Sequence, residues 1–272
     1  MGREGDARKR MARLSASADG AKGLDEPQRR MGLCRNERHK HSGNPQKWDG
    51  KILVPFAVES ALSGVGRLLN PDEFLWYTRT INCNPKRGER ILLHFGGVDF
   101  RTMVFVGHAE VTDVPHEGGQ NPFTLDITDY VKSGDNTLTV CVWDPTEDFV
   151  NSRGKQSFNP NGCFYTRVSG IWQTVWMETV PESYIESYKC TTDIDNGEVR
   201  FDFKVAGPET DEDVKIDIYD GDVRVASAEK DADKPVFCAF FFSALGRKHC
   251  RPQFVQFLPW FNPYKRNAPP VG

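Results

Sequence analysis

The sequence predicts an all-β protein, because apolar and polar residues alternate with a period of two along several short segments. Residues 123–127 and 138–142 show this alternation most clearly. It buries one face of a strand and exposes the other. Turn-forming clusters at 82–88, 117–121 and 133–136 separate the segments, and long amphipathic helices are missing. Many short strands with irregular connections indicate an antiparallel sandwich or jelly roll.

The elements of a first domain, residues 48–183, follow from the same pattern. Segments rich in β-branched and aromatic residues are bounded by glycine, proline and asparagine clusters, which favour turns. One helical turn is expected at 129–132, because Gly134 follows it as a C-terminal stop. These criteria place strands at 52–58, 73–81, 89–96, 98–106, 123–127, 138–142 and 171–180.

The first 47 residues differ in composition from the rest of the chain. They hold 12 Lys and Arg against 6 Asp and Glu, and they contain no Phe, Trp or Tyr. A segment with so little apolar surface cannot offset the entropy that is lost on ordering. We therefore expect residues 1–47 to be a disordered basic segment, either a solvated tail or a misassigned start, with a basic arm for an acidic partner as the alternative.

A second β-domain is expected at 184–235. Residues 199–205, 214–218 and 223–228 are predicted to be three strands, and the Asp-Gly pair at 220–221 is typical of a tight hairpin turn. An immunoglobulin-like sandwich has about seven strands. The domain is therefore predicted to be partial.

Residues 236–272 change character again. Seven of the 18 Phe residues lie between Phe237 and Phe261, and no Asp or Glu follows Asp233. This composition matches neither neighbouring segment. We interpret it as an atypical tail that could come from a shifted reading frame, with peripheral membrane anchoring as the alternative.

Charge and apolar content exclude several classes of function. The formal net charge of −3 gives no overall attraction to nucleic acid or to an anionic membrane. No run approaches the roughly 18 apolar residues of a membrane span, and no secretory signal is visible. The seven cysteines lack metal-ligand spacing, and no phosphate-binding glycine loop occurs. We therefore expect no metal, no cofactor, no nucleic acid partner and no membrane partner, and a cytoplasmic location.

Three ordered motifs lie in the first domain. VPFAVESALSGVGR covers 54–67, LLHFGGVDFRTMVFV and HEGGQNPFTLDITDYV lie within 92–131, and YTRVSGIWQTVWMETVP covers 165–181. Together they resemble the N-terminal sugar-binding domain of glycoside hydrolase family 2, the family of β-galactosidases, β-glucuronidases and β-mannosidases. One departure is Gly107-His108, where the family usually has Asn-Gly after a strand.

The resemblance implies a galactose-binding-like jelly roll followed by an immunoglobulin-like sandwich, here truncated. In the family a (β/α)8 barrel follows and carries two catalytic Glu residues, one as general acid/base and one as nucleophile. Such a barrel needs roughly 250 residues. The 37 residues after position 235 contain no Asp or Glu. No catalytic residue can therefore be placed on this sequence.

The resemblance also implies that a loop of the first domain reaches the rim of the barrel's active site. Asp144 could accept from two sugar hydroxyls, and Arg153 could donate in a planar fork. Gln156 could do both, and Tyr165 could stack or donate. Each has an alternative role, because Asp144 could start a turn, Arg153 could pair with a nearby carboxylate and Tyr165 could pack in the core. The sugar-binding candidates are Asp144, Arg153, Gln156 and Tyr165.

Four tryptophans lie in or beside the expected strands. They could form a stacking platform for a sugar, but their neighbours are strong strand formers, which favours packing in the core or between domains. The four are Trp76, Trp143, Trp172 and Trp176.

These features predict the N-terminal carbohydrate-binding portion of a family 2 glycoside hydrolase, inactive alone because the barrel is missing. The expected partners are a β-glycoside and a catalytic barrel domain in a longer protein. A stand-alone carbohydrate-binding module or pseudo-enzyme subunit is the alternative. A sandwich that binds other proteins is a third hypothesis, and measurable sugar affinity would separate it from the second.

Overall fold

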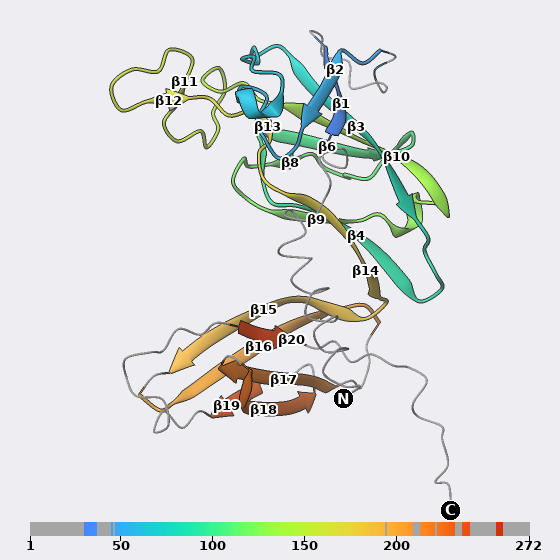
Figure 1. The fold of residues 1–272 in the computed structure, drawn as a ribbon, viewed down its shortest axis with the longest axis vertical. Helices are drawn as coiled ribbons and strands as arrows, with labels where there is room; N and C mark the ends of the chain where they lie inside the picture. Colours follow the sequence, from blue (N-terminus) through green and yellow to red (C-terminus); the bar gives the residue numbers. More distant parts are fainter. Residues whose placement is uncertain are drawn as a thin grey trace, which may run out of the picture. The chain divides into compact units, whose positions relative to one another are not determined.

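The computed structural model describes residues 30–36, 45, 47–193, 195–208, 213–220, 222–231, 236–239 and 254–257. Nearly all ordered elements among them are strands (Figure 1). Two single-turn 3-10 helices occur in this part of the chain, η2 (Ala61–Ser63) and η3 (Thr128–Tyr130). The chain divides into two compact units, Met1–Thr179 and Val180–Gly272. The predicted all-β class is therefore confirmed.

The first unit contains an antiparallel sheet of seven strands. Its members are β1 (Arg30–Asn36), β2 (Gly50–Leu53), β3 (Phe74–Cys83), β6 (Arg101–Val106), β7 (Ala109–Glu110), β8 (His116–Glu117) and β10 (Gly134–Trp143). The strand order is β2-β1-β3-β10-β6-β7, and β8 also pairs with β6. The two long strands, β3 and β10, pair along their whole length and form the centre of the sheet.

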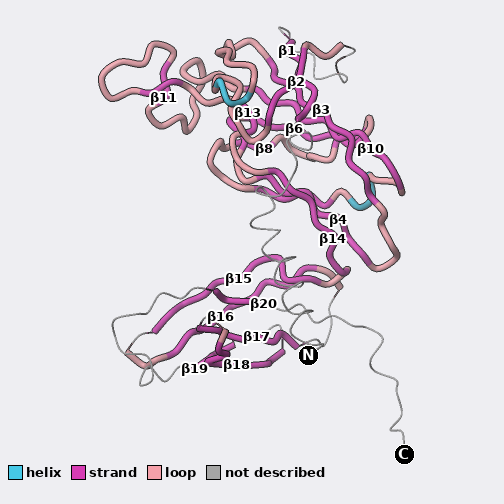
Figure 2. The backbone as a smooth tube through the Cα atoms, viewed as in Figure 1, coloured by secondary structure: helices cyan, strands magenta, loops and turns pink. Residues whose placement is uncertain are grey.

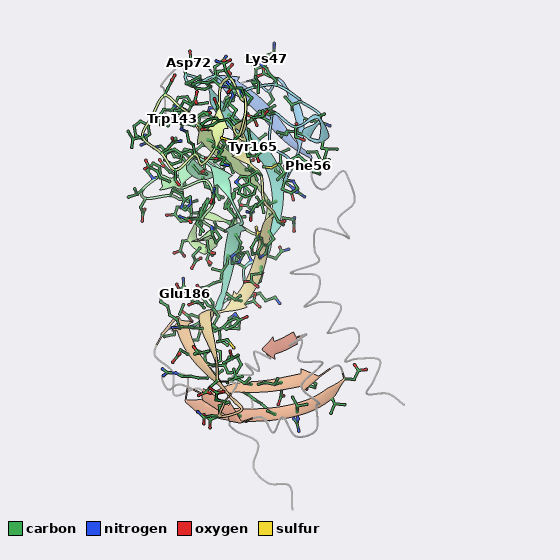
Figure 3. The ribbon with its side chains drawn as sticks, turned by 90° about the vertical axis from the view of Figure 1, so that its left-hand side faces the viewer. Lys47, Phe56, Asp72, Trp143, Tyr165 and Glu186 are labelled. Atoms are coloured by element: carbon green, nitrogen blue, oxygen red, sulfur yellow. The ribbon has the colours of Figure 1, made fainter. Side chains whose placement is uncertain are left out.

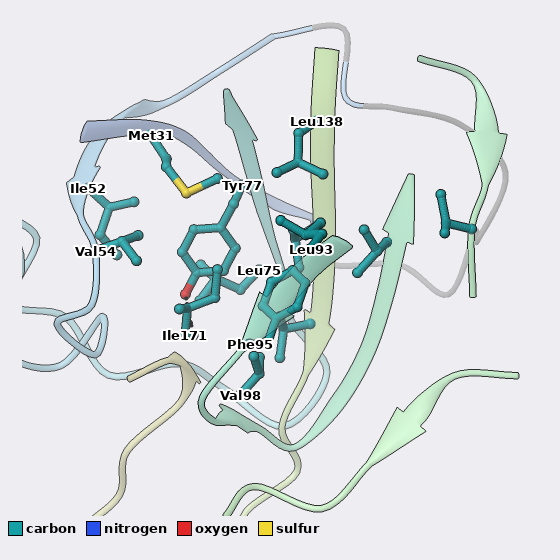
Figure 4. Close-up of a cluster of buried hydrophobic side chains, with 14 of the residues drawn as sticks. Met31, Ile52, Val54, Leu75, Tyr77, Leu93, Phe95, Val98, Leu138 and Ile171 are labelled. Atoms are coloured by element: carbon teal, nitrogen blue, oxygen red, sulfur yellow. Dashed lines mark hydrogen bonds between the residues drawn. The ribbon is translucent and has the colours of Figure 1, made fainter. Parts of the chain in front are cut away.

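A smaller sheet packs on the first through a shared apolar core. It consists of β14 (Val175–Pro181), β4 (Glu89–Phe95) and β9 (Phe123–Asp126), in that order. Leu93 and Phe95 of β4 are buried in the same cluster as Leu75 and Tyr77 of β3 (Figure 4). A short antiparallel pair, β5 (Val98–Asp99) and β13 (Gly170–Ile171), lies beside this core. The first unit is therefore a β-sandwich, as predicted.

The expectation that residues 1–47 form no packed structure is wrong at β1. Met31 and Leu33 are 6% and 3% exposed and belong to the main core. β1 pairs with β2 on one side and β3 on the other. Two alternating apolar residues suffice here, because hydrogen bonds on both edges satisfy the backbone of the strand. Apart from β1 and residues 45 and 47, that segment lies outside the described residues.

Turns shorten or divide several predicted strands. The strand expected at 52–58 ends at Leu53, where a turn begins, and the one at 98–106 divides into β5 and β6. The segment 171–180 likewise divides into β13 and β14. The hairpin turn at Gly107-His108 does form, since Val106 pairs with Ala109 and Gly107 has φ +61°.

The second unit holds six described strands in two sheets (Figure 2). One sheet has the order β15-β16-β19 and the other β18-β17-β20, around a small core that includes Phe201 and Ile216. The strands are β15 (Tyr184–Asp193), β16 (Glu198–Ala206), β17 (Asp213–Asp220), β18 (Val223–Asp231), β19 (Val236–Ala239) and β20 (Phe254–Phe257).

Three of these six strands correspond to predicted ones, and three were not expected. β15 shows no alternation because most of its residues are exposed. β19 and β20 belong to the segment interpreted as an atypical tail, and their backbones pair with β16 and β17. The rest of residues 240–272 lies outside the described residues.

Candidate functional site

All four sugar-binding candidates lie on one long loop, residues 144–169, which connects the end of β10 to β13. Within it, β11 (Gln156–Ser157) and β12 (Tyr165–Thr166) form a short parallel pair with Gln156 opposite Tyr165. Figure 1 shows this loop extending beyond the strands of the sandwich. The loop therefore leaves the sandwich at the end of β10 and returns to it at the start of β13.

Asp144 lies at the root of the long loop, where β10 ends. It is only 2% exposed, and both of its carboxylate oxygens have partners. The backbone N–H of Thr146 donates to Oδ1 at 2.8 Å, and the Ser169 hydroxyl donates to Oδ2 at 2.5 Å. The carboxylate therefore starts a turn and joins the two ends of the loop, and in this arrangement it faces the protein interior.

Gln156 is also held by internal hydrogen bonds. Its Nε2 donates to Oδ2 of Asp99 at 3.0 Å, and its Oε1 accepts from the backbone N–H of Val168 at 2.6 Å. Asp99 is buried at the end of β5. Gln156 thus ties the middle of the loop both to the sandwich and to the returning end of the loop.

A third carboxyl group completes this arrangement. Oε2 of Glu59 accepts from the backbone N–H of Ser169 at 3.0 Å, while its Oε1 is enclosed and has no hydrogen-bond partner. Arg167 is buried, and its guanidinium lies 4.8 Å from the ring centroid of Phe158. Six side chains form what we call the root cluster: Glu59, Asp99, Asp144, Gln156, Arg167 and Ser169.

Burial shifts the titration of all three carboxyl groups in the root cluster. Burial, together with the charges of Asp144 and Glu59, raises the pKa of Asp99 to about 7, against a lowering effect of the Gln156 hydrogen bond. Burial also raises the pKa of Glu59 and of Asp144. The cluster can therefore retain a proton near neutral pH.

Arg153 occupies the outer part of the long loop. Its Nη1 lies 2.7 Å from Oε1 of Glu147 and donates to the carbonyl of Gln156 at 3.1 Å. Hydrogen bonds from the Phe158 backbone and from Arg153 lower the pKa of Glu147. The alternative role of Arg153, a pair with a nearby carboxylate, is thus realised, and the pair fixes the guanidinium on the loop.

Tyr165 is the exposed member of the four candidates. It is 66% exposed, and its backbone N–H donates to the carbonyl of Lys155 at 2.9 Å. Figure 3 labels both Tyr165 and Trp143, the residue that precedes the long loop. The neighbouring Phe164 and, earlier in the loop, Phe149 are also exposed. The alternative that Tyr165 packs in the core is therefore wrong.

The tryptophans mostly serve packing. Trp76 is buried on the outer face of the large sheet. The indole N–H of Trp143 donates to the Pro71 carbonyl, and that of Trp172 to the Gly119 carbonyl, both at 2.7 Å. Trp176 stacks on the ring of His94, with 4.8 Å between centroids, and stays partly exposed.

The sequence analysis assigned no role to Glu59, Asp99, Arg167 or Ser169. Each of the four lies in one of the three motifs. A polar residue among the apolar residues of a motif is the sequence signal that could have indicated a buried polar role. Among the described residues, no group of three or more His, Cys, Asp or Glu side chains could hold a metal ion. In the same part of the chain, no helix has the length and apolar character needed to cross a membrane.

A β-sandwich that carries a long, internally braced loop is typical of a binding domain. Residues 53–181 match the family model for the sugar binding domain of glycosyl hydrolases family 2. This part of the chain is therefore a family 2 sugar binding domain, as the resemblance of its motifs predicted.

Individual relatives agree with this assignment. A putative beta-glucuronidase of Formosa agariphila is 30% identical over 118 residues, which cover 43% of this chain and 13% of that protein. The beta-glucuronidase of Sus scrofa is 27% identical over 202 residues, which cover 62% of this chain and 30% of that protein. The chain thus spans less than a third of the length of these relatives.

A solved structure supports the fold beyond the matched domain. The beta-glucuronidase of an uncultured Clostridium species superposes with a TM-score of 0.60 at 21% identity, covering 78% of this chain and 38% of that one. At this level of identity the likeness concerns the fold alone.

Proposed function

We propose that this chain is the N-terminal carbohydrate-binding portion of a family 2 glycoside hydrolase and that it binds a β-glycoside through the long loop. The observation that carries the proposal is Tyr165, a largely exposed aromatic residue on a loop whose roots are fixed by buried hydrogen bonds. An aromatic face that is held in place can stack under the C–H face of a sugar without a large loss of side-chain entropy.

The other three candidates divide into two roles in this proposal. Arg153 donates to sugar hydroxyls or to a carboxylate, because Glu147 holds it without enclosing it. Asp144 and Gln156 are positioning residues, because their polar atoms are already engaged inside the protein. We further propose that the binding domain begins at β1 and reaches residue 183, with the partial immunoglobulin-like domain after it.

The chain alone is proposed to bind sugar and not to hydrolyse it. Glycoside hydrolysis needs two carboxyl groups on opposite sides of a bound glycosidic bond. Near the long loop, the carboxyl groups of Asp99 and Asp144 are buried, and Glu147 is paired with Arg153. Catalysis is therefore assigned to a partner barrel domain, and 4-nitrophenyl β-glycosides should release no nitrophenol with this chain alone.

One observation favours the alternative of a stand-alone binding module or pseudo-enzyme subunit. The main core is composed of residues between Met31 and Val175, so the sandwich buries its apolar residues within itself. A domain with its own core could fold and bind without a barrel. Addition of a separate barrel polypeptide that restores hydrolysis would identify the subunit role.

A calorimetric titration with methyl β-D-glucuronide and methyl β-D-galactoside tests the binding proposal. We expect the Tyr165→Ala variant to lose about tenfold in affinity for the sugar that binds, which corresponds to about 1.4 kcal/mol. Tyr188→Ala is the matched control, because Tyr188 is also exposed, at 51%, but lies in the second unit. No binding by the unmodified chain, or equal loss in both variants, would contradict the proposal.

A further inference from the structure

The root cluster connects both ends of the long loop to the sandwich through carboxyl groups. Ser169 bridges two of them, with its hydroxyl donating to Asp144 and its backbone N–H donating to Glu59. Gln156 bridges the third, Asp99, to the backbone of Val168. The hold on the loop therefore depends on the state of these three carboxyl groups.

The cluster has too little positive charge for three ionised carboxylates. Arg167 is the guanidinium whose charge acts on Asp144, while Asp144 and Glu59 both act unfavourably on Asp99. Oε1 of Glu59 is enclosed without a donor. Carboxyl groups that share a buried site cannot all ionise at their ordinary pKa, because each further negative charge repels the others and has lost its hydration.

We propose that the root cluster is a proton-dependent latch, which holds the long loop firmly while one carboxyl group is protonated and loosens it when all three are ionised. The proposal deepens the proposed function, because the latch would regulate the surface that carries Tyr165 and Arg153. The latch itself follows from the geometry of the cluster and does not require that a sugar binds.

Asp99 is the group that retains the proton, and its surroundings come from several elements. Asp144 follows β10, Glu59 follows β2, and Gln156 lies on β11. On another side, a Cβ atom at Gly119 would lie 2.4 Å from the Asp99 carboxyl carbon, so the backbone there approaches closely. Two further titratable groups act on the other carboxyl groups of the cluster: the charge of Arg167 acts on Asp144, and the charge of Glu59 disfavours ionisation of Tyr77 on β3.

The direction of the pH effect follows from the difference between the latched and the released loop. Latched, Asp99 has a pKa of about 7, whereas released into water it returns towards its ordinary value of 3.8. The latched state therefore binds more protons between these two values. The equilibrium constant for closing the loop is therefore highest below pH ~4. It falls about tenfold per pH unit up to pH ~7 and is constant at higher pH.

Hydrogen exchange of two backbone amides in the intact chain tests the latch directly. The N–H of Val168 donates to Gln156 and the N–H of Ser169 donates to Glu59, so both are exposed only when the loop opens. After correction for intrinsic exchange, we expect their protection to fall roughly 100-fold between pH 5 and pH 7. The amide of Phe201, in the middle strand β16 of the second unit, reports an opening that does not expose Asp99 and should not follow this change.

A neutral substitution supplies the matched comparison. Asp99→Asn keeps an oxygen for the Gln156 amide but cannot ionise, so we expect a clearly shallower pH dependence at Val168 and Ser169. Asp113→Asn, at an exposed position, should behave as the unmodified chain. Protection that is flat from pH 5 to pH 8 in the unmodified chain would overturn the latch, and so would an undiminished slope in Asp99→Asn.

If Asp99→Asn does not fold, the carboxyl carbon of Asp99 can be titrated by NMR in the unmodified chain. A midpoint between about 6 and 8 supports the latch, and a midpoint below 5 overturns it. Sugar titrations at pH 5.5 and 7.5 separate the two proposals. A pH-dependent loop without any sugar affinity rejects the proposed function alone, whereas sugar binding with a pH-independent loop rejects the latch alone.

Discussion

Gly170 is a residue at which the sandwich tolerates no side chain. Its φ is +82°, and a Cβ atom there would lie 2.0 Å from the Tyr77 hydroxyl and 2.7 Å from Cδ2 of Leu75. The position joins the end of the long loop to β13, next to the hydrogen bond from the Ile171 N–H to Tyr77. Glycine is therefore required both by backbone conformation and by close approach.

We expect Gly170→Ala to lower the free energy of unfolding by on the order of 2–4 kcal/mol, from backbone strain and overpacking together. Gly50→Ala is the control, because no heavy atom lies within 4 Å of its added Cβ. That variant should stay within about 0.5 kcal/mol of the unmodified chain. Urea denaturation measures the free energy of unfolding of both variants. Equal values would show that a side chain at position 170 is tolerated.

The candidate site was predictable in part at the residue scale. The motifs led to the four loop residues, and the exposure of Tyr165 agrees with the role given to it. The burial of Asp144 was not predictable, because Asp144 is bound by Ser169, 25 residues further along the chain, and Ser169 is itself held by Glu59, 110 residues away. Contacts over such a separation leave no local periodicity that a single sequence would display.

At the scale of elements, β1 shows how little apolar sequence a paired strand needs. Leu33 is almost fully buried in the main core although its segment is basic. We expect Leu33→Ala to destabilise the sandwich by about 2–5 kcal/mol, because it leaves a cavity. Leu62→Ala should change stability by less than about 0.5 kcal/mol, since Leu62 is exposed. If thermal unfolding is the same in both variants, β1 is not part of the sandwich.

Strand prediction succeeded where one face is buried and failed where it is not. The alternation at 138–142 predicted β10 correctly, but the expected exposed face is wrong: Leu138, Val140 and Val142 lie in the main core, and Cys141 is buried in a second apolar cluster. β15 pairs with β16 along its length yet exposes most of its side chains, so its residues carry no pattern. Backbone pairing alone, without burial, gives no periodic signal.

At the scale of the whole molecule, the two units have separate cores. The core of the first unit and the smaller core around Phe201 share no residue. The family match covers residues 53–181, which lie almost entirely in the first unit. Sugar recognition is therefore expected to be a property of the first unit, and the second unit should not contribute to affinity.

The most direct test of this account is to map amide chemical shifts of the intact chain during titration with the methyl glycoside that binds. We predict that the shifts concentrate in residues 145–168, around Tyr165 and Arg153, and that strands of the second unit stay unchanged. Shifts confined to another surface, or no shifts at millimolar sugar, would contradict the assignment of the long loop as the sugar-binding element.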